Sequence, residues 1–196
     1  MKAFIQALML VTTSLISLSS YASITVTDSL GQHQLSEMPK RIVALNWDLA
    51  EQLIELDVTP VGVPNIKDYT TWVVKPAIPE SVQDVGTRAE PNMEKLAELK
   101  PDVILVASPQ KDLIPRLKTI APVLYYQTYN ADQDSAKAAI ENFKNIAHLI
   151  GKTDLAEQKL QTMHNRFSEL KQQLNAAFSG QMPSIAAMRF ANQTSI

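Results

Sequence analysis

The stretch Asp84-Val-Gly-Thr-Arg-Ala-Glu-Pro-Asn-Met-Glu-Lys-Leu-Ala-Glu-Leu-Lys-Pro-Asp-Val-Ile-Leu-Val-Ala107 decides the fold. It begins with a loop that carries one basic residue, Arg88. An amphipathic helix is predicted over residues 92–99, and it ends before Pro101 because proline cannot continue a helix. The apolar run at residues 103–107 then predicts a buried strand. The loop is therefore held at a fixed place beside a sheet, and we expect the guanidinium of Arg88 to be free to face a ligand.

Short strands and helices alternate on both sides of this stretch. A short strand and turn are predicted at residues 24–32, strands at residues 42–45, 61–63, 103–107 and 123–126, and helices at residues 47–56, 92–99 and 113–120. Residues 64–85 contain three prolines and no clear period, so we expect a loop that wraps the surface. Alternation of this kind is typical of an α/β fold, here a Rossmann-like parallel sheet with crossover helices.

Two longer helices follow, at about residues 135–150 and 154–178. The second has an apolar stripe spaced mostly by three or four residues, formed by Leu155, Leu160, Met163, Phe167, Leu170, Leu174 and Phe178. It would span roughly 37 Å, which suits a strut more than an ordinary domain helix. Residues 184–190 look like the first strand of a second lobe, and we expect that lobe to be truncated.

The N-terminus reads as a targeting segment. Lys2 provides a basic start, residues 3–18 form an apolar core, and Ser20-Tyr-Ala22 is a small-x-small cleavage site. This pattern predicts a cleavable signal peptide over residues 1–22. The alternative is a membrane anchor, but the apolar run is short and rich in Ser and Thr. No cysteine is available for lipid attachment, so we expect a free periplasmic protein.

Composition excludes several classes of function. The chain has 18 basic and 20 acidic residues, and removal of Lys2 with the signal peptide changes the net charge from −2 to −3. Nucleic-acid binding, which favours a basic face, is therefore not expected. No Gly-rich phosphate loop, Gly-x-Ser-x-Gly elbow or cysteine nucleophile is present. The three histidines, His33, His148 and His164, show no metal-ligand spacing.

The opening stretch resembles the N-terminal lobe of periplasmic binding proteins for iron–siderophore and cobalamin complexes, and the ferric-hydroxamate binders in particular. The resemblance extends upstream through Arg41-Ile-Val-Ala-Leu-Asn-Trp47, Pro60-Val-Gly-Val63 and Asp68-Tyr-Thr-Thr-Trp-Val73, and it covers residues 24–190. It implies a ligand-binding lobe over residues 23–152, an inter-lobe helix over residues 153–180, and the start of a truncated second lobe at residues 181–196.

The resemblance implies four ligand-binding residues: Arg88, Trp72, Trp47 and Gln110. Arg88 can contact two iron-bound hydroxamate oxygens at once, because its guanidinium is a planar, permanently charged fork. The alternative is a solvated surface arginine, or one paired with Glu90. The two tryptophans offer apolar walls for a bulky ligand, the alternative being core packing.

Gln110 marks a departure from the hydroxamate binders, which carry a tyrosine there whose hydroxyl contacts ligand. An amide can still donate a hydrogen bond but offers no ring, so the identity of the siderophore is open. Of the adjacent residues Tyr125 and Tyr126, at most one can face the cleft, because alternate side chains of a strand point opposite ways.

The resemblance implies that the chain binds an iron(III)–siderophore in the periplasm and delivers it to an inner-membrane ABC permease. No protein-bound metal or cofactor is expected, because the iron arrives wrapped by its chelator. Cobalamin or haem binding is the alternative within the family. A truncated fragment that does not bind is a second alternative, and an enzyme on the same sheet is a third.

Overall fold

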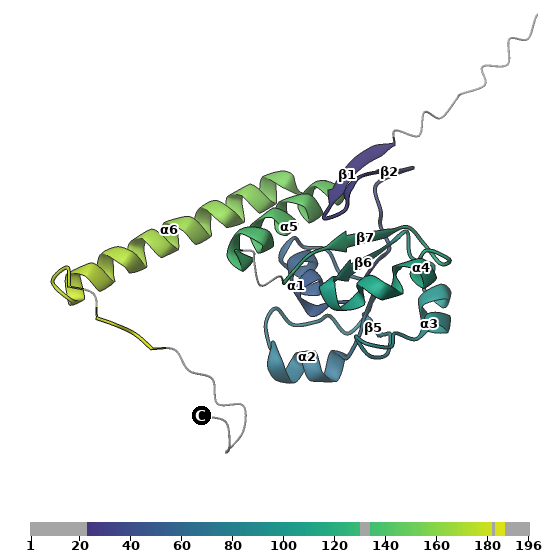
Figure 1. Cartoon of the computed structure of the whole chain (residues 1–196), viewed down its shortest axis with the longest axis horizontal. Coiled ribbons are helices and arrows are strands. Elements are labelled where there is room, and N and C mark those ends of the chain that lie inside the picture. Colours follow the sequence, from purple (N-terminus) through teal and green to yellow (C-terminus); the bar gives the residue numbers. More distant parts are fainter. Residues whose placement is uncertain (1–22, 130–133, 182, 187–196) are drawn as a thin grey trace, which may run out of the picture.

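A computed structural model describes residues 23–129, 134–181 and 183–186 of the chain. Its centre is a five-stranded parallel sheet with the order β5-β4-β3-β6-β7 (Figure 1). The strands are β3 (Ile42–Ala44), β4 (Gly62–Val63), β5 (Gln83–Asp84), β6 (Val103–Ala107) and β7 (Val123–Tyr126). The apolar runs at residues 42–45 and 103–107 form the two central strands, which pair in register from Ile42 with Val103. The predicted α/β fold with a parallel sheet is confirmed.

Helices cover both faces of this sheet. They are α1 (Trp47–Glu55), α2 (Ile66–Trp72), α3 (Met93–Glu98), the 3₁₀ helix η1 (Ser108–Leu113), α4 (Ile114–Leu117), α5 (Ser135–Leu149) and α6 (Thr153–Ala177). Alternate residues of β6 serve two cores, as the pleat of a strand requires. Leu105 packs with side chains of α1 and α5, whereas Ile104 packs with Leu96 of α3 and Leu117 of α4.

The helix α3 shows why the structure of residues 84–107 could be predicted from the sequence. Its N-cap is Asn92, whose side chain accepts a hydrogen bond from the backbone N–H of Lys95 at 3.0 Å. Its end is marked by Lys100, which has a positive φ of 44°, and by the following Pro101. A capping residue and a proline are both local signals, so the predicted bounds are correct within one residue.

Two local predictions were wrong. Residues 64–85 are not only a loop, because they contain α2 and β5. The helix α2 has one buried residue, Tyr69, and its N-cap Asn65 makes no side-chain capping bond, so neither a period nor a start signal was available. The helix predicted at residues 113–120 is α4, which is shorter and is continuous with η1 before it.

A β-hairpin, β1 (Ile24–Asp28) and β2 (Gly31–Leu35), docks on the edge strand β7. The buried carboxylate of Asp28 accepts the backbone N–H of Tyr125 at 2.8 Å, and the backbone N–H of Ser29 donates to the Tyr125 carbonyl at 2.8 Å. The Ser29 hydroxyl accepts the backbone N–H of Gln127 at 2.7 Å. These bonds occupy polar groups that an open sheet edge would leave unpaired.

Only the N-terminal part of the long helix α6 packs on the lobe. Its first turns pack on α5, and the rest projects away from the sheet (Figure 1). Within the described residues, no helix is long and apolar enough to cross a membrane. The predicted signal peptide lies outside the described residues. So does most of the strand predicted at residues 184–190, of which residues 184–186 are described and have no regular structure.

Candidate functional site

The loops that follow the parallel strands meet at one edge of the sheet, where ligands of open α/β folds bind. Trp47 begins α1 just after β3, and Trp72 ends α2 after β4. Arg88 follows β5, and Gln110 lies in η1 after β6. The sheet topology thus places all four predicted site residues on loops or helix ends at its carboxyl edge.

Arg88 and Trp47 form the centre of this edge. The guanidinium carbon of Arg88 lies 3.8 Å from the centroid of the Trp47 ring, a cation–π contact. The indole N–H of Trp47 donates to the carbonyl of Pro64 at 2.9 Å, which fixes the ring. A guanidinium that stacks through its face keeps its N–H edge available for an anion. The alternative pairing of Arg88 with Glu90 is not seen among the ion pairs of the described residues.

Tyr69 supports the indole from the side. Its ring meets Trp47 edge-to-face, with 6.0 Å between the centroids and an angle of 89°. Its hydroxyl donates to the carbonyl of Pro76 at 2.7 Å. Burial, followed by the charges of Glu51 and Glu55, raises the pKa of Tyr69 to about 12.

The Arg88 loop is held by its own backbone and by Asn65. Gly86 has a φ of 96°, and a Cβ there would lie 3.1 Å from the backbone N of Asn92 and 3.2 Å from the carbonyl of Glu90. The backbone N–H of Arg88 donates to the side-chain oxygen of Asn65 at 2.9 Å. The loop is therefore closed on itself and tied to the start of α2.

Gln110 is buried and hydrogen-bonded to the Arg88 loop. Its side chain is 1% exposed. Its amide N–H donates to the carbonyl of Arg88 at 3.2 Å, and its amide oxygen accepts the backbone N–H of Ala107 at 3.3 Å and the side-chain N–H of Asn46 at 3.5 Å. The predicted donor is present, but its acceptor is the Arg88 loop. We interpret Gln110 as the residue that positions Arg88 over Trp47.

Replacing Gln110 with leucine tests this role. The change leaves the Ala107 N–H and the Arg88 carbonyl without their partner, and we expect the free energy of unfolding to fall by about 1–2 kcal/mol. Urea denaturation of the purified chain measures the loss. Gln110→Glu keeps an acceptor for Ala107 but places a buried carboxylate against the Arg88 carbonyl, so it should lower the free energy of unfolding at least as much as Gln110→Leu does. No change in stability or in tryptophan emission in Gln110→Leu would contradict the assignment.

Trp72 stands apart from the Arg88–Trp47 pair. Its side chain is 79% exposed, so it is not a core residue. The structure brings Arg88, Trp47 and Gln110 together and leaves Trp72 as a free aromatic at the end of α2. Sequence reasoning missed Asn65 and Tyr69, since a lone Asn and a lone Tyr in a proline-rich stretch carry no signal of a role.

The remaining candidates have structural roles. Tyr125 and Tyr126 point to opposite faces of the sheet and are both buried, so neither faces the cleft. His33 contacts the Asp28 carboxylate at 2.8 Å, and His148 lies 3.2 Å from the carbonyl of Thr25. Among the described residues, no group of three or more His, Cys, Asp or Glu could hold a metal ion.

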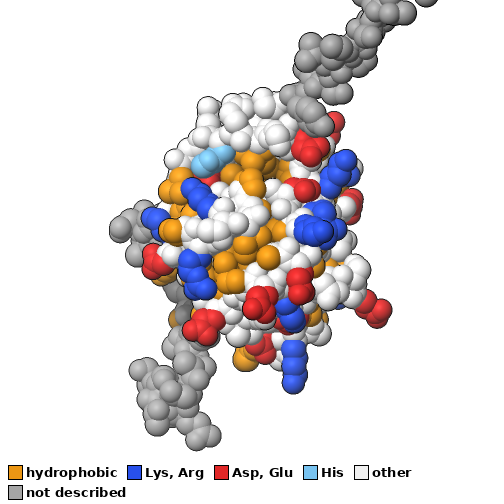
Figure 2. Space-filling model, turned by 90° about the vertical axis from the view of Figure 1, so that its right-hand side faces the viewer, with side chains coloured by type: hydrophobic (Ala, Val, Ile, Leu, Met, Phe, Trp, Pro, Cys, Tyr) orange, Lys and Arg blue, Asp and Glu red, His pale blue; other side chains and the backbone are white. Residues whose placement is uncertain are grey.

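Charges of both signs are mixed on the face shown in Figure 2, where hydrophobic side chains gather in the middle and charged ones surround them. Nucleic-acid binding requires a basic face of one sign. This face does not provide one.

Comparison with known proteins defines the class. A model of the periplasmic binding protein family matches residues 42–195, and the chain belongs to this family. A putative ABC transporter substrate-binding lipoprotein of Bacillus subtilis is 36% identical over 157 residues, which is 78% of this chain and 47% of that protein. The iron(3+)-hydroxamate-binding protein FhuD of Escherichia coli is 35% identical over 128 residues, 65% of this chain and 43% of FhuD.

A solved structure is more similar still. The siderophore-binding protein FhuD of Vibrio cholerae, bound to Fe3+–Desferal, is 52% identical with a TM-score of 0.76, covering 78% of this chain and 57% of that one. The chain spans about half the length of the curated relatives it matches. These relatives are named as binding proteins.

Proposed function

We propose that this chain carries the N-terminal ligand-binding lobe of a periplasmic ferric-siderophore binding protein of the hydroxamate type. In this proposal residues 1–22 direct export, residues 23–152 bind ligand, residues 153–180 link two lobes, and residues 181–196 begin the second. The observation that carries the proposal is the Arg88 guanidinium stacked on Trp47 at the carboxyl edge of the sheet.

The chemistry of the site suits a ferric hydroxamate. Such a complex presents iron-bound oxygens with partial negative charge, and its chelator has an apolar backbone. The N–H edge of Arg88 can donate to two of these oxygens. The exposed ring of Trp72 can lie against the backbone, while Gln110 and Asn65 hold the Arg88 loop. The 52% identical Vibrio cholerae protein, solved with Fe3+–Desferal, supports the same ligand class.

Delivery to an inner-membrane ABC permease is part of the proposal, supported by a Bacillus subtilis relative named as an ABC transporter substrate-binding lipoprotein. One lobe offers only part of a two-sided cleft. If a complete binder has a Kd of about 1 µM, or about −8 kcal/mol, half of that energy leaves a Kd of about 1 mM. We therefore expect residues 23–196 to bind ferric hydroxamates weakly.

The test is a titration of residues 23–196 with ferric Desferal, followed by the intrinsic fluorescence of the two tryptophans. Saturable quenching at about millimolar concentration is expected. Free N-acetyltryptophanamide corrects for light absorbed by the complex, and iron-free Desferal shows whether the metal-bound oxygens are required. Absence of saturable quenching, or equal quenching by the iron-free chelator, would overturn the proposal. Cobalamin and haem, titrated in the same way, test the alternative ligands.

A further inference from the structure

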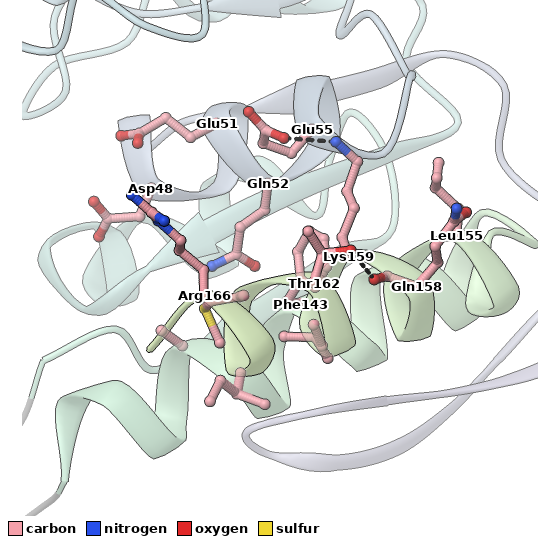
Figure 3. Close-up of a pocket in the computed structure, with 14 residues that line it drawn as sticks. Asp48, Glu51, Gln52, Glu55, Phe143, Leu155, Gln158, Lys159, Thr162 and Arg166 are labelled. Atoms are coloured by element: carbon pink, nitrogen blue, oxygen red, sulfur yellow. Dashed lines mark hydrogen bonds and ion pairs between the residues drawn. The ribbon is translucent and has the colours of Figure 1, made fainter. Parts of the chain in front are cut away.

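The largest hollow among the described residues does not include the Arg88–Trp47 pair. It is a groove of about 900 Å³ between α1, α5 and α6, and none of the four predicted site residues lines it. Figure 3 shows its two rims, joined by the ion pair between Glu55 of α1 and Lys159 of α6. The proposed ligand site is instead the open carboxyl edge of the sheet. Exposed side chains at that edge therefore indicate, better than a cavity does, which residues can touch a ligand.

β7 is the one strand of the parallel sheet whose following loop has no assigned role. The segments after the other four strands place Trp47, Trp72, Arg88 and Gln110 at the carboxyl edge. The loop after β7 begins with residues 127–129 and carries Tyr129. β7 and β4 lie on opposite sides of the central pair of strands, β3 and β6. The loop after β7 and the helix α2 therefore flank the central pair from opposite sides.

The register of the sheet places Tyr129 beside the support of Arg88. Ala107 of β6 pairs with Tyr126 of β7. Gln110 and Tyr129 each follow three residues after these paired positions. Neighbouring strands lie about 4.8 Å apart, so the two segments leave the sheet at adjacent points. Since Gln110 donates to the carbonyl of Arg88 at 3.2 Å, the loop after β7 is next to the element that holds the Arg88 loop.

The backbone of residues 127–129 is held by side chains of two neighbouring helices. The amide of Asn142 in α5 donates to the carbonyl of Gln127 at 3.1 Å. The hydroxyl of Ser108 in η1 accepts the backbone N–H of Thr128 at 3.3 Å and donates to the carbonyl of Tyr129 at 3.3 Å. The base of the Tyr129 side chain is therefore fixed against η1 before any ligand arrives, which lowers the entropy lost on binding.

Tyr129 is also one of two exposed aromatic residues on this lobe. Its side chain is 72% exposed, and that of Trp72 is 79% exposed. The other aromatic residues described between residues 23 and 152 are partly or fully buried, namely Trp47, Tyr69, Tyr125, Tyr126 and Phe143. A single exposed ring is ordinary on a protein surface. Here both exposed rings lie at the edge where the ligand is proposed to bind, and the covered rings support the core or the indole of Trp47.

We propose that Tyr129 is a ligand-contacting residue of this site, an inference that rests on the proposed function. Its ring packs against the apolar backbone of a hydroxamate chelator, and its hydroxyl donates to an iron-bound oxygen. A phenol suits both tasks because it combines a flat apolar face with one O–H donor. The buried amide of Gln110 can do neither. The ferric complex then lies over Arg88, between the ring of Trp72 on one side and the ring of Tyr129 on the other.

Paramagnetic broadening tests where Tyr129 lies relative to the iron. The iron(III) of ferric Desferal broadens the NMR signals of nearby nuclei, whereas gallium(III) Desferal has the same charge and is diamagnetic. Residues 23–196 labelled with 3-fluorotyrosine give four ring signals, which replacement by phenylalanine assigns to Tyr69, Tyr125, Tyr126 and Tyr129. We expect ferric Desferal to broaden the Tyr129 signal more than those of Tyr125 and Tyr126, and gallium Desferal to broaden none. Broadening of Tyr129 no greater than that of Tyr125 would overturn the proposal.

Two variants separate the hydroxyl from the ring. In equilibrium dialysis of residues 23–196 with ferric Desferal, Tyr129→Phe should lower the ratio of bound to free ligand about two- to tenfold, the effect of one hydrogen bond. Tyr129→Ala should lower it further. Phe167→Ala, which removes a 63% exposed ring of α6, is the matched control and should bind as the wild type does. No second lobe faces the site in this chain, so a loss of binding reports contact with the ligand and not with that lobe.

The same measurements distinguish a failure of this inference from a failure of the proposed function. Saturable tryptophan quenching by ferric Desferal, together with a Tyr129→Ala variant that binds like Phe167→Ala, would overturn the role of Tyr129 and leave the proposed function standing. Absence of saturable binding in the wild-type chain would overturn both.

Discussion

Replacing Arg88 with alanine in a two-lobed version of the protein should weaken binding of ferric Desferal by about 1.5–3 kcal/mol, or roughly 10- to 150-fold in Kd. The guanidinium carries a permanent positive charge at the centre of the proposed site, and its position over Trp47 is fixed before ligand arrives. Loss of a charged, pre-positioned donor removes both the attraction and the orientation that the loop provides.

Equilibrium dialysis, read from the visible absorbance of the ferric complex, measures this loss without using the tryptophans that Arg88 contacts. When binding is weak, the ratio of bound to free ligand is proportional to the affinity. The ratio measured for each variant can therefore be compared directly with that of the wild type. Arg88→Lys should recover only part of the affinity, because an ammonium cannot make a two-pronged contact. Arg116→Ala removes an exposed arginine of α4 and is the matched control. If Arg88→Ala binds as tightly as this control, Arg88 is a surface residue and the proposed site is wrong.

The second large effect is expected at Asp28, which joins the hairpin to the sheet. One carboxylate oxygen accepts the backbone N–H groups of Leu30 and Gly31 at 2.7 and 3.1 Å, and contacts His33 at 2.8 Å. The other accepts the backbone N–H of Tyr125 at 2.8 Å. Asp28→Ala leaves these donors without their acceptor in a buried place, and we expect the free energy of unfolding to fall by about 3 kcal/mol.

Urea denaturation followed by circular dichroism measures this change. Asp112→Ala, which removes an exposed carboxylate, should stay within about 0.5 kcal/mol of the wild type. His33→Ala should cost less than Asp28→Ala, because it leaves the three backbone donors satisfied. Equal stability of the Asp28 and Asp112 variants would show that this carboxylate does not dock the hairpin.

The central part of the fold could be predicted because its signals are local. The buried runs of β3 and β6, the Asn92 cap and the Pro101 stop each act within a few residues. The helix α2 escaped detection because its structure depends on tertiary contacts, of which the burial of Tyr69 is the main one. Asp28 escaped for a related reason, since its partner Tyr125 is 97 residues away.

The arrangement of the candidate site could not be predicted from the sequence. Arg88 and Trp47 stand 41 positions apart, and nothing in their spacing indicates that the guanidinium lies on the indole. Gln110 was expected to donate a hydrogen bond, and it does, but to the carbonyl of Arg88. The packing of η1 against the Arg88 loop decides which partner the Gln110 side chain bonds. The pattern of residue types does not contain this information.

The docking of the β1–β2 hairpin has a consequence for the order in which the chain folds. Its anchors join residues 97, 98 and 123 positions apart: Asp28 with Tyr125, Ser29 with Gln127, and Thr25 with His148. Contacts of such sequence separation form late, since closing long loops costs entropy that local contacts avoid. An isolated two-stranded hairpin is marginal in water. The hairpin is therefore among the last parts of the lobe to become fixed, although it precedes the parallel sheet in the sequence, and it stays accessible until β7 and α5 are in place.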